Sequence, residues 1–299
     1  APASAQDEMT LILDWFVNPN HGPVVVAEDL GLFKAEGLEV EVIAPADPST
    51  PPRMVAAGEA DLAISYQPQQ HVQVAEGMPL LRVGTLVPMP LNCLLVRADG
   101  PVQTLADLEG KRVGFSVAGV EEALLTRLLG GVGLTLDDIE MVNVNFSLAP
   151  PVMTGQVDAA IGAVRNYQPI QMAQEGIDAR CFPLEEAGLP AYDELIFVAN
   201  AEEMDRDAIR RFLSAIEAAT HVIVNEPARG WEIFAAANPE LDDALNRGAW
   251  EATWPRFALA PAALDAGRYA RFERFLFEAG VLADTRPVSA VAADLGADG

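Results

Sequence analysis

The chain of 299 residues is long enough to bury two hydrophobic cores, and 51% hydrophobic with 21% charged residues is the composition of a folded globular protein. It carries 19 Lys and Arg against 44 Asp and Glu, a formal net charge of −25, which argues against nucleic acid and anionic membrane surfaces as partners. The sequence contains no apolar run of about 18 residues, so no membrane span is predicted.

The chain begins with the small, polar segment Ala1–Thr10, which we interpret as a mature N-terminus left after cleavage of a signal peptide. Apolar runs alternating with Gly-, Pro- and Asp-containing turns then predict an α/β organisation. The expected strands are Thr10–Leu13, Leu38–Ile43, Leu62–Ile64, Leu80–Leu86 and Asn92–Val96, and the expected helices are Pro23–Phe33, Arg53–Ala57 and Gln69–Glu76. The polar break Arg97–Pro101 predicts the crossing to a second lobe.

The second half repeats this alternation before becoming helical. The expected strands are Arg112–Phe115, Glu140–Val144 and Ala159–Ala163, with a helix at Ala123–Gly130 and a return to the first lobe at Tyr192–Ala199. Helices that cover the first lobe are expected at Asp207–Asn225, Pro227–Asn238, Leu241–Trp254 and Ala262–Ala279, followed by a loosely held tail from Ala283. The predicted lobes are 1–97 with 199–299, and 98–198.

One motif occurs once in each predicted lobe. A Gly-x-x-Asp turn at 58–61, an apolar strand and Tyr-Gln-Pro at 66–68 recur as a Gly-x-x-Asp turn at 155–158, an apolar strand and Tyr-Gln-Pro at 167–169. This repetition predicts two similar α/β lobes that face each other.

A dense group of polar and aromatic side chains follows the first strand, in the segment Leu11–Pro23. Its members are Asp14, Trp15, Asn18, Asn20 and His21. Open α/β sheets build ligand sites beyond the carboxyl ends of their strands, so this loop is the primary candidate site. The indole suits a flat ring, and the polar groups suit its edge.

The chain resembles the solute-binding proteins of importers for thiamine-pyrimidine precursors in four segments: LDWFVNPNHGPVVVAEDLGLFKAEGLEVEV, GEADLAISYQPQQHVQVAEGMPL, LADLEGKRVGF and GQVDAAIG. The most specific part is the D-W-x-x-N-P-N-H loop at 14–21. The resemblance implies a type II periplasmic-binding-protein fold, an α/β architecture of two lobes with a ligand cleft between them. It also implies an exported, periplasmic protein that delivers a small heterocyclic ligand to ABC permease subunits, and we expect a monomer.

The fungal thiamine-pyrimidine synthase shares this pattern and provides an alternative function. Its resemblance implies a lysine that forms a Schiff base with pyridoxal phosphate, a histidine consumed as substrate, and a cysteine-rich run. This chain has Ser65 and Gln69 at the first two positions and no cysteine in the third region, GLPAYDELIFV. A hydroxyl cannot form a Schiff base, so we expect a binding protein without a cofactor. We treat the nearby His71 as a surface residue.

The two cysteines, Cys93 and Cys181, have no metal-ligand spacing, and either a disulfide or two buried thiols fits the sequence. Desulfinases of this fold use a cysteine nucleophile, but Cys93 lies in an apolar strand, where we expect an inert thiol. We predict neither a metal site nor catalytic residues.

We expect an aminopyrimidine bound between the lobes, with Trp15 and Tyr66 supplying ring faces and Glu194, or else Asp14, accepting from an exocyclic amine. The predicted ligand-binding residues are Asp14, Trp15, Asn18, Asn20, His21, Tyr66, Gln67, Gly119, Glu121, Tyr192 and Glu194. Gly119 and Glu121 would close from the second lobe.

Several assignments stay open at this level. Glu194 could instead form a salt bridge, Asp14 could cap the loop and orient His21, and Tyr66 could be a core residue. Asn145 and Asn166 are weaker candidates, and Trp254 is more often core. Riboflavin, sulfonate or nitrate are alternative ligands, although the only basic candidates near the cleft are Arg53, Arg97 and Arg165.

Overall fold

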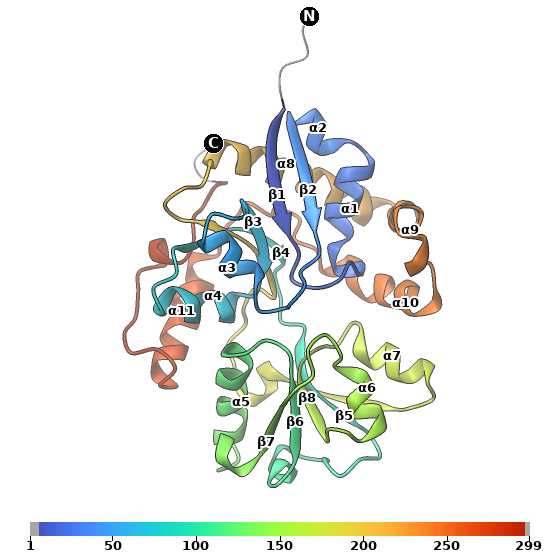
Figure 1. The fold of residues 1–299 in the computed structure, drawn as a ribbon, viewed down its shortest axis with the longest axis vertical. Helices are drawn as coiled ribbons and strands as arrows, with labels where there is room; N and C mark the ends of the chain where they lie inside the picture. Colours follow the sequence, from blue (N-terminus) through green and yellow to red (C-terminus); the bar gives the residue numbers. More distant parts are fainter. Residues whose placement is uncertain (1–5, 297–299) are drawn as a thin grey trace, which may run out of the picture.

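The computed structural model describes residues 6–296 and folds them into two lobes, each built on a five-stranded sheet (Figure 1). The strands of the first sheet, in spatial order, are β2 (Leu38–Ile43), β1 (Asp7–Ile12), β3 (Leu62–Ser65), β10 (Leu195–Asn200) and β4 (Leu80–Val87). Those of the second sheet are β7 (Glu140–Asn143), β6 (Arg112–Phe115), β8 (Ala159–Val164), β5 (Asn92–Arg97) and β9 (Ala179–Pro183). The predicted two-lobed α/β architecture is confirmed.

Each sheet combines parallel strands with one antiparallel strand that arrives from the other lobe. In the first sheet, β1 is parallel to β2 and β3, whereas β10 is antiparallel to β3 and β4. In the second sheet, β6 is parallel to β7 and β8, whereas β5 is antiparallel to β8 and β9. The two lobes therefore share one topology, as the repeated motif predicted.

Helices connect and cover these strands. They are α1 (Gly22–Asp29), α2 (Leu32–Ala35), α3 (Pro51–Ala56), α4 (Gln67–Ala75), α5 (Val120–Gly130), α6 (Ala149–Thr154), α7 (Gln168–Gln174), α8 (Arg206–Asn225), α9 (Pro227–Ala237), α10 (Ala244–Thr253) and α11 (Ala266–Glu278). Short 3₁₀ helices are η1 (Pro19–His21), η2 (Leu105–Leu108), η3 (Leu136–Asp138), η4 (Leu184–Ala187), η5 (Pro239–Leu241), η6 (Trp254–Arg256) and η7 (Val288–Ala290). The single helix predicted over 23–33 is divided at Gly31, whose φ of 68° is left-handed and ends a right-handed helix.

The predicted lobe boundaries are wrong at both crossings. Strand β5 belongs to the second sheet, so the chain crosses at residues 88–91 rather than at the polar break after β5. Strand β10 belongs to the first sheet, so the return lies at residues 188–194. The break at 97–101 is an ordinary surface turn, and pairing with β8 and β9, which lie far along the chain, decides where β5 belongs.

The C-terminal tail is also held more firmly than predicted, up to residue 296. Arg82 of β4 is fully buried, and its backbone N–H donates to Val291 while its guanidinium donates to the carbonyl of Ala293. Ala293 returns a backbone hydrogen bond to Arg82. A tail that extends the edge of the sheet in this way has its backbone groups satisfied, which the local sequence does not reveal.

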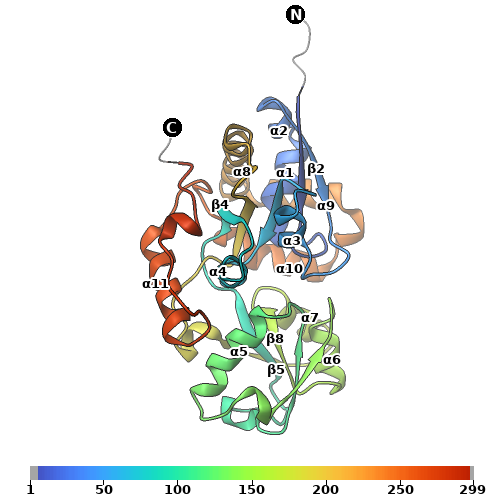
Figure 2. The same ribbon diagram turned by 60° about the vertical axis from the view of Figure 1, so that its left-hand side comes forward.

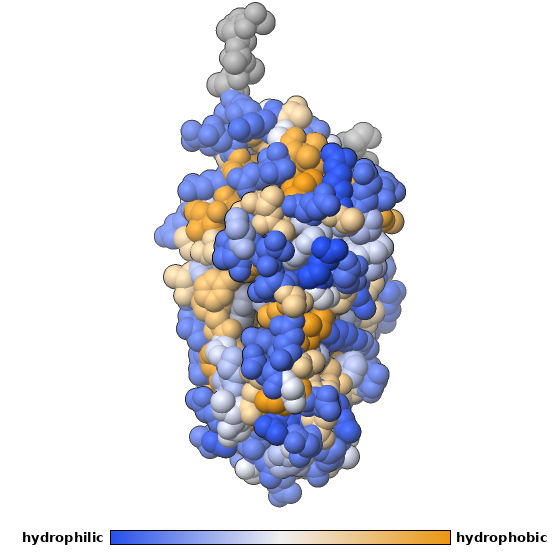
Figure 3. Space-filling model, turned by 90° about the vertical axis from the view of Figure 1, so that its right-hand side faces the viewer, coloured by the Kyte–Doolittle hydropathy of each residue, from blue (hydrophilic) through white to orange (hydrophobic). Residues whose placement is uncertain are grey.

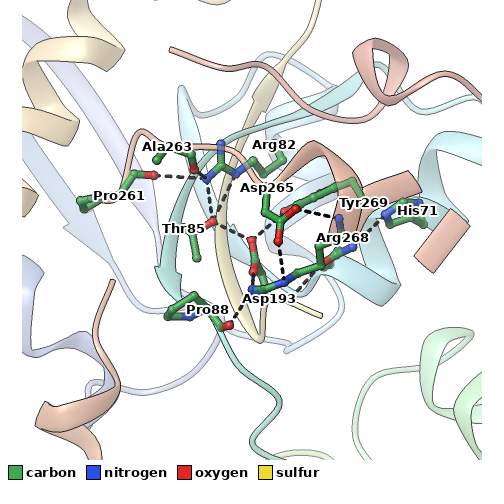
Figure 4. A network of polar contacts seen from close by, with 11 residues as sticks. His71, Arg82, Thr85, Pro88, Asp193, Pro261, Ala263, Asp265, Arg268 and Tyr269 are labelled. Carbon is green, nitrogen blue, oxygen red and sulfur yellow. Dashed lines mark hydrogen bonds and ion pairs between the residues drawn. The ribbon is translucent and has the colours of Figure 1, made fainter. Parts of the chain in front are cut away.

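A buried polar network joins the return crossing to α11 (Figure 4). Asp193 accepts from Thr85 Oγ1 at 2.8 Å and from the Tyr269 hydroxyl at 3.2 Å, and it forms an ion pair with Arg268. His71 contacts Glu273 of α11 and has no exposed surface, so its interpretation as a surface residue is wrong. Its helix, α4, lies beside α11, as Figure 2 shows.

The helix α11 touches the second lobe as well. The guanidinium of Arg127, in α5, lies 6.0 Å from the centroid of the Phe275 ring. Figure 2 shows α11 beside α4 and extending toward the level of α5. This helix therefore spans the side of the molecule where the crossings lie.

The surface agrees with the acidic composition. Figure 3 shows a face dominated by hydrophilic residues, with hydrophobic residues in scattered groups. Among residues 6–296, none of the helices combines the length and apolarity that a membrane span requires. The same residues contain no cluster of three or more His, Cys, Asp or Glu side chains able to hold a metal ion. Residues 1–5 of the segment interpreted as a mature N-terminus lie outside the described residues.

Cys93 and Cys181 form a disulfide that joins the neighbouring strands β5 and β9. This decides between the two alternatives that the sequence left open, and Cys93 is not the inert thiol that we expected. The bond lies within the second lobe, so it does not restrict movement between lobes. Disulfides persist in oxidising compartments.

We expect neither cysteine to react with a maleimide in the unfolded protein until a reductant is added, because both sulfurs are in the disulfide. Mass spectrometry of the denatured protein before and after reduction measures this directly. A Cys93→Ala/Cys181→Ala double variant is the control. Labelling of the unreduced wild type at both positions would contradict the bond.

Candidate functional site

A cavity of about 280 Å³ lies between the two sheets and is lined by residues of both lobes. The lining comes from segments at strand ends: the loop after β1, the residues after β3 and β8, the loop between β6 and α5, and both crossings. Ligand sites in α/β folds occur where such strand ends meet, because the loops there are free to carry polar groups on a rigid frame.

Eight of the eleven predicted ligand-binding residues line this cleft. They are Asp14, Trp15, Asn18, Asn20, Tyr66, Glu121, Tyr192 and Glu194. The other three, His21, Gln67 and Gly119, do not line it. The cleft is thus the place where the predicted side chains converge.

The loop after β1 is organised by an Asp14-centred network. Because His21 Nδ1 accepts the backbone N–H of Asn18, its Nε2 carries the proton and donates to Asp14 Oδ1 at 2.9 Å. The Tyr66 hydroxyl donates to Asp14 Oδ2 at 2.6 Å. Asn18 caps the short helix η1 by accepting the N–H of Asn20. Asp14 therefore orients His21, one of the two roles left open, and also fixes Tyr66.

Burial and the neighbouring Asp14 carboxylate raise the pKa of Tyr66 well above its usual range. The phenol stays protonated and keeps its hydrogen bond to Asp14 at neutral pH. Tyr66 lies at the N-terminus of α4 and packs against the cores of both lobes. It is thus a core residue on one side and a cleft residue on the other.

Trp15 presents its indole to the cleft from the first lobe. Its ring lies edge-on against Phe146 of the second lobe, with centroids 4.8 Å apart. Phe16, which is 52% exposed, also contacts Phe146, at 4.3 Å. These rings form an aromatic contact between the lobes at the edge of the cleft.

Glu194 is buried at the return crossing and points one carboxylate oxygen at the backbone. Its Oε2 accepts the N–H groups of Leu91 and Asn92, at 2.5 and 2.8 Å, and the hydroxyl of Tyr192 at 3.2 Å. The structure records no hydrogen bond to Oε1 from any described residue. Burial raises the pKa of Glu194 to about 6, so the side chain is mostly ionised at neutral pH. Among residues 6–296, Glu194 forms no salt bridge, so that alternative is not realised there.

Glu121 of α5 faces the cleft from the second lobe in a similar way. Its Oε2 accepts the N–H groups of Ser116 and Val117, at 2.6 and 3.1 Å. Burial, supported by the charges of Glu122 and Glu194, raises the pKa of Glu121 to about 8. The two glutamates thus enter the cleft from opposite lobes with different protonation states at neutral pH.

The cleft is acidic. Among the described residues that line it are three carboxylic acids, Asp14, Glu121 and Glu194, and neither lysine nor arginine. Arg165 lies behind Leu91 and Asn92, whose carbonyls accept its hydrogen bonds, and it forms an ion pair with Glu185 at 2.6 Å. The positive charge of Arg165 is therefore already neutralised.

The three predicted residues that do not line the cleft have structural contacts instead. Gln67 is fully buried, and its Oε1 accepts the N–H of Asp193 at 2.7 Å. His21 lies behind Asp14, as described above. Gly119 precedes α5 with its N–H directed to Glu122. Residue type alone did not distinguish these supporting groups from their neighbours in the cleft.

Several cleft residues were not among the predicted set. Asn92, Leu148, Gly162, Tyr167 and Gln168 all line it. The repeated Tyr-Gln-Pro motif contained a signal for two of them, because Tyr167 stands at the N-terminus of α7 as Tyr66 stands at that of α4. Asn92 gave no such signal, since its strand was assigned to the wrong lobe.

The weaker candidates lie at the margin. Asn166 donates to Asn20 at 2.7 Å and to Thr253 at 2.8 Å, so it links the lobes without lining the cleft. Asn145 lies in the loop after β7 with a positive φ of 51°. Trp254 packs against the core of the first lobe, as expected.

Comparison with known proteins adds to this geometry. The sequence profile of the family described as “NMT1/THI5 like” matches residues 18–230. A Haemophilus influenzae protein named for thiamine biosynthesis is 46% identical over 282 residues, 94% of this chain and 90% of that protein. A formylaminopyrimidine-binding protein of Halalkalibacterium halodurans is 31% identical over 196 residues, 66% of this chain and 59% of that protein. A Legionella pneumophila protein named 4-amino-5-hydroxymethyl-2-methylpyrimidine phosphate synthase is 23% identical over 287 residues, which are 93% of this chain and 90% of that protein.

Solved structures are similar over nearly the whole chain. The alkanesulfonate-binding protein SsuA of Xanthomonas axonopodis pv. citri has a TM-score of 0.73 at 19% identity, covering 98% of this chain and all of that one. The periplasmic nitrate-binding protein NrtA of Synechocystis has a TM-score of 0.74 at 15% identity, and the alignment covers 100% of this chain and 89% of that one. Such low identities show the fold alone, and the predicted periplasmic-binding-protein fold is confirmed.

Proposed function

The chain belongs to the NMT1/THI5-like family, and from this premise and its cleft we propose that it is the solute-binding protein of an ABC importer for a thiamine pyrimidine precursor. The solute would be an aminopyrimidine of the hydroxymethyl or formylamino type. The names of the Haemophilus and Halalkalibacterium relatives support this class of solute.

One observation carries the proposal: the cleft combines aromatic walls with carboxylates and contains no basic side chain among its described lining residues. A sulfonate or nitrate ion would be placed beside Asp14, Glu121 and Glu194 with no cation to offset their charge. A neutral heterocycle with an exocyclic amine instead supplies the hydrogen-bond donors that carboxylates need in a dry site.

In the proposed complex the pyrimidine ring lies against Trp15, with Tyr66 as a second ring face. The exocyclic amine donates to Glu194 Oε1, the oxygen that the backbone does not use. Asn18 and Asn20 hold the loop and contact the polar substituent. An analogue without the amine would leave a buried carboxylate unpaired, and the site would discriminate against it.

Closure of the lobes would accompany binding, because the cleft is lined from both of them. The permease of the importer would bind the closed form, with the protein acting as a monomer. The disulfide between Cys93 and Cys181 supports export to the periplasm, since such bonds are rare in the cytosol.

Synthesis of the pyrimidine by this chain is not part of the proposal. The position that resembles the Schiff-base lysine holds Ser65, whose hydroxyl donates to Gln69 at 3.2 Å; neither residue lines the cleft. The chain contains only two lysines, Lys34 and Lys111, and neither lines it. These residues do not fit a cofactor that needs a lysine amine.

Isothermal titration tests the proposal with four solutes: 4-amino-5-hydroxymethyl-2-methylpyrimidine, a formylaminopyrimidine, an alkanesulfonate and nitrate. We expect at least one aminopyrimidine to bind with a Kd of about 1 µM or tighter, and no heat from either anion. Native mass spectrometry of the purified protein should detect a pyrimidine that copurifies. Binding of an anion with no response to aminopyrimidines would overturn the proposal.

A further inference from the structure

The carboxyl group of Glu121 is held in the wall of the cleft by two backbone N–H groups on one side and by Gly162 on the other. Only 4% of Glu121 is exposed, and its Oε2 accepts two backbone N–H groups from the loop between β6 and α5. The other oxygen, Oε1, lies over Gly162 of β8, whose φ is +88°; a Cβ at this position would overlap Oε1. This position of the carboxyl group requires glycine at residue 162 for two reasons: the positive φ, and the space that a Cβ would take from Oε1.

This arrangement determines where a proton on Glu121 resides. Because Oε2 already accepts two N–H groups, a proton on the carboxyl group is carried by Oε1. No described residue forms a hydrogen bond with Oε1, and Glu121 lines the cleft. A protonated Glu121 thus carries, beside Gly162 in the wall of the cleft, an O–H donor that no described residue uses.

The charges around Glu121 favour that protonated form. Its own helix contributes Glu122, the return crossing contributes Glu194, and the corner between β3 and α4 contributes the phenol of Tyr66 beside Asp14. The backbone N–H groups of the loop after β6 lower the pKa of Glu121, but burial raises it by more, and β8 contributes only Gly162. None of these groups is a cation, so ionising Glu121 adds a further anion to a buried cleft that already holds Asp14 and Glu194.

We propose that Glu121 determines specificity by binding the solute as a neutral carboxylic acid whose Oε1–H donates to an acceptor atom of the solute. Glu194 accepts from the amine at the same time. The two glutamates together select a solute that has one hydrogen-bond acceptor beside one donor. A neutral aminopyrimidine has this edge, with its ring nitrogen as the acceptor and its amine as the donor. The ring-protonated cation does not, because its ring nitrogen is no longer an acceptor. This inference rests on the proposed function.

The pH dependence follows from the raised pKa of Glu121. In this structure the pKa of Glu121 is about 8, above the ordinary carboxyl value of 4.5, so the carboxyl group is protonated at neutral pH. The protonated form that the solute needs predominates below about pH 8 and is lost as the pH rises through that value. Affinity should therefore be nearly constant below about pH 7 and fall above about pH 8, by at most about tenfold per pH unit.

Titration calorimetry with 4-amino-5-hydroxymethyl-2-methylpyrimidine between about pH 6 and about pH 9 tests this in the wild type and in Glu121→Gln. The glutamine amide donates at every pH, so the ratio of wild-type to variant affinity isolates the proton on Glu121 from any titration of the solute. We expect this ratio to fall more than about tenfold across the range. Glu39→Gln, which removes an exposed acid of β2 that does not line the cleft, should retain the wild-type pH profile.

Each outcome decides between roles. A ratio that rises with pH would mean that Glu121 binds as an anion, and a flat ratio would reduce it to a structural support; either result overturns the inference while the proposed function stands. Absence of aminopyrimidine binding by the wild type at every pH would overturn both. Glu121→Ala, which lacks any donor, should lose at least about tenfold in affinity at about pH 6.

Discussion

Replacing Glu194 by glutamine is expected to weaken aminopyrimidine binding by roughly 100- to 1,000-fold, the loss typical of removing one partner from a buried, charged hydrogen bond. The glutamine carbonyl oxygen can still accept the N–H groups of Leu91 and Asn92, so these two backbone groups keep their hydrogen bonds. Its amide nitrogen then faces the amine of the solute, donor against donor. Titration calorimetry measures the loss.

The control is Glu39→Gln, which changes an exposed glutamate of β2 by the same atoms. It should bind as the wild type does, and both variants should keep the wild-type melting temperature within a few degrees. A solute with a keto oxygen in place of the amine should bind Glu194→Gln better than the wild type. Equal affinities of the wild type and Glu194→Gln for the aminopyrimidine would remove Glu194 from the site.

Replacing Trp15 by alanine should weaken binding by about 10- to 100-fold, because stacking of a heterocycle on an aromatic side chain contributes about 1–3 kcal/mol. The truncation also removes the edge-on contact with Phe146, which joins the lobes. Titration calorimetry of the variant reports the affinity, and circular dichroism reports whether it is folded.

The Trp15→Phe variant tests whether an aromatic face is enough, because it keeps an aromatic ring but loses the indole N–H and the larger indole surface. Because phenylalanine retains an aromatic face, this variant should bind within about tenfold of the wild type. Unchanged affinity in a folded Trp15→Ala protein would rule out the loop after β1 as the solute site. Asp14 and Asn18, which belong to that loop, would then not be solute-binding residues.

The two glutamates show why the geometry matters for the chemistry. Both line the cleft, and each has one oxygen held by a pair of backbone N–H groups while no described residue forms a hydrogen bond with the other. Glu194 has a pKa of about 6 and Glu121 one of about 8, so near neutral pH one accepts and the other donates. Carboxyl groups in different environments can thus perform opposite tasks in one site.

Local sequence patterns were reliable where a short segment determines its own structure. The alternation of LEVEVI predicted β2 with the bounds that the structure has, and the family resemblance drawn from the D-W-x-x-N-P-N-H loop agrees with the profile match. The repeated motif correctly indicated two lobes of one topology. In each case the information lies within a few consecutive residues, through strand periodicity and turn chemistry.

The failures share one cause. Strand β5 was assigned to the first lobe because a polar turn follows it, although its partners β8 and β9 lie in the second. His71 was placed on the surface because it is out of register with the histidine that the resemblance implies, although α11, about 200 residues later, covers it. The tail was expected to be loose, although it pairs with Arg82. Contacts between distant segments decided all three.

The amino-acid sequence by itself determined the kind of protein: two α/β lobes, an acidic chain, and a set of aromatic and acidic residues placed at strand ends. Only the tertiary structure decided which of two neighbouring residues faces the cleft, such as Asn20 rather than His21 or Glu121 rather than Gly119. It also decided that Cys93 and Cys181 are bonded. The physical reason is that side-chain direction, burial and protonation depend on what packs against a residue from elsewhere in the chain, and no local pattern encodes that neighbour.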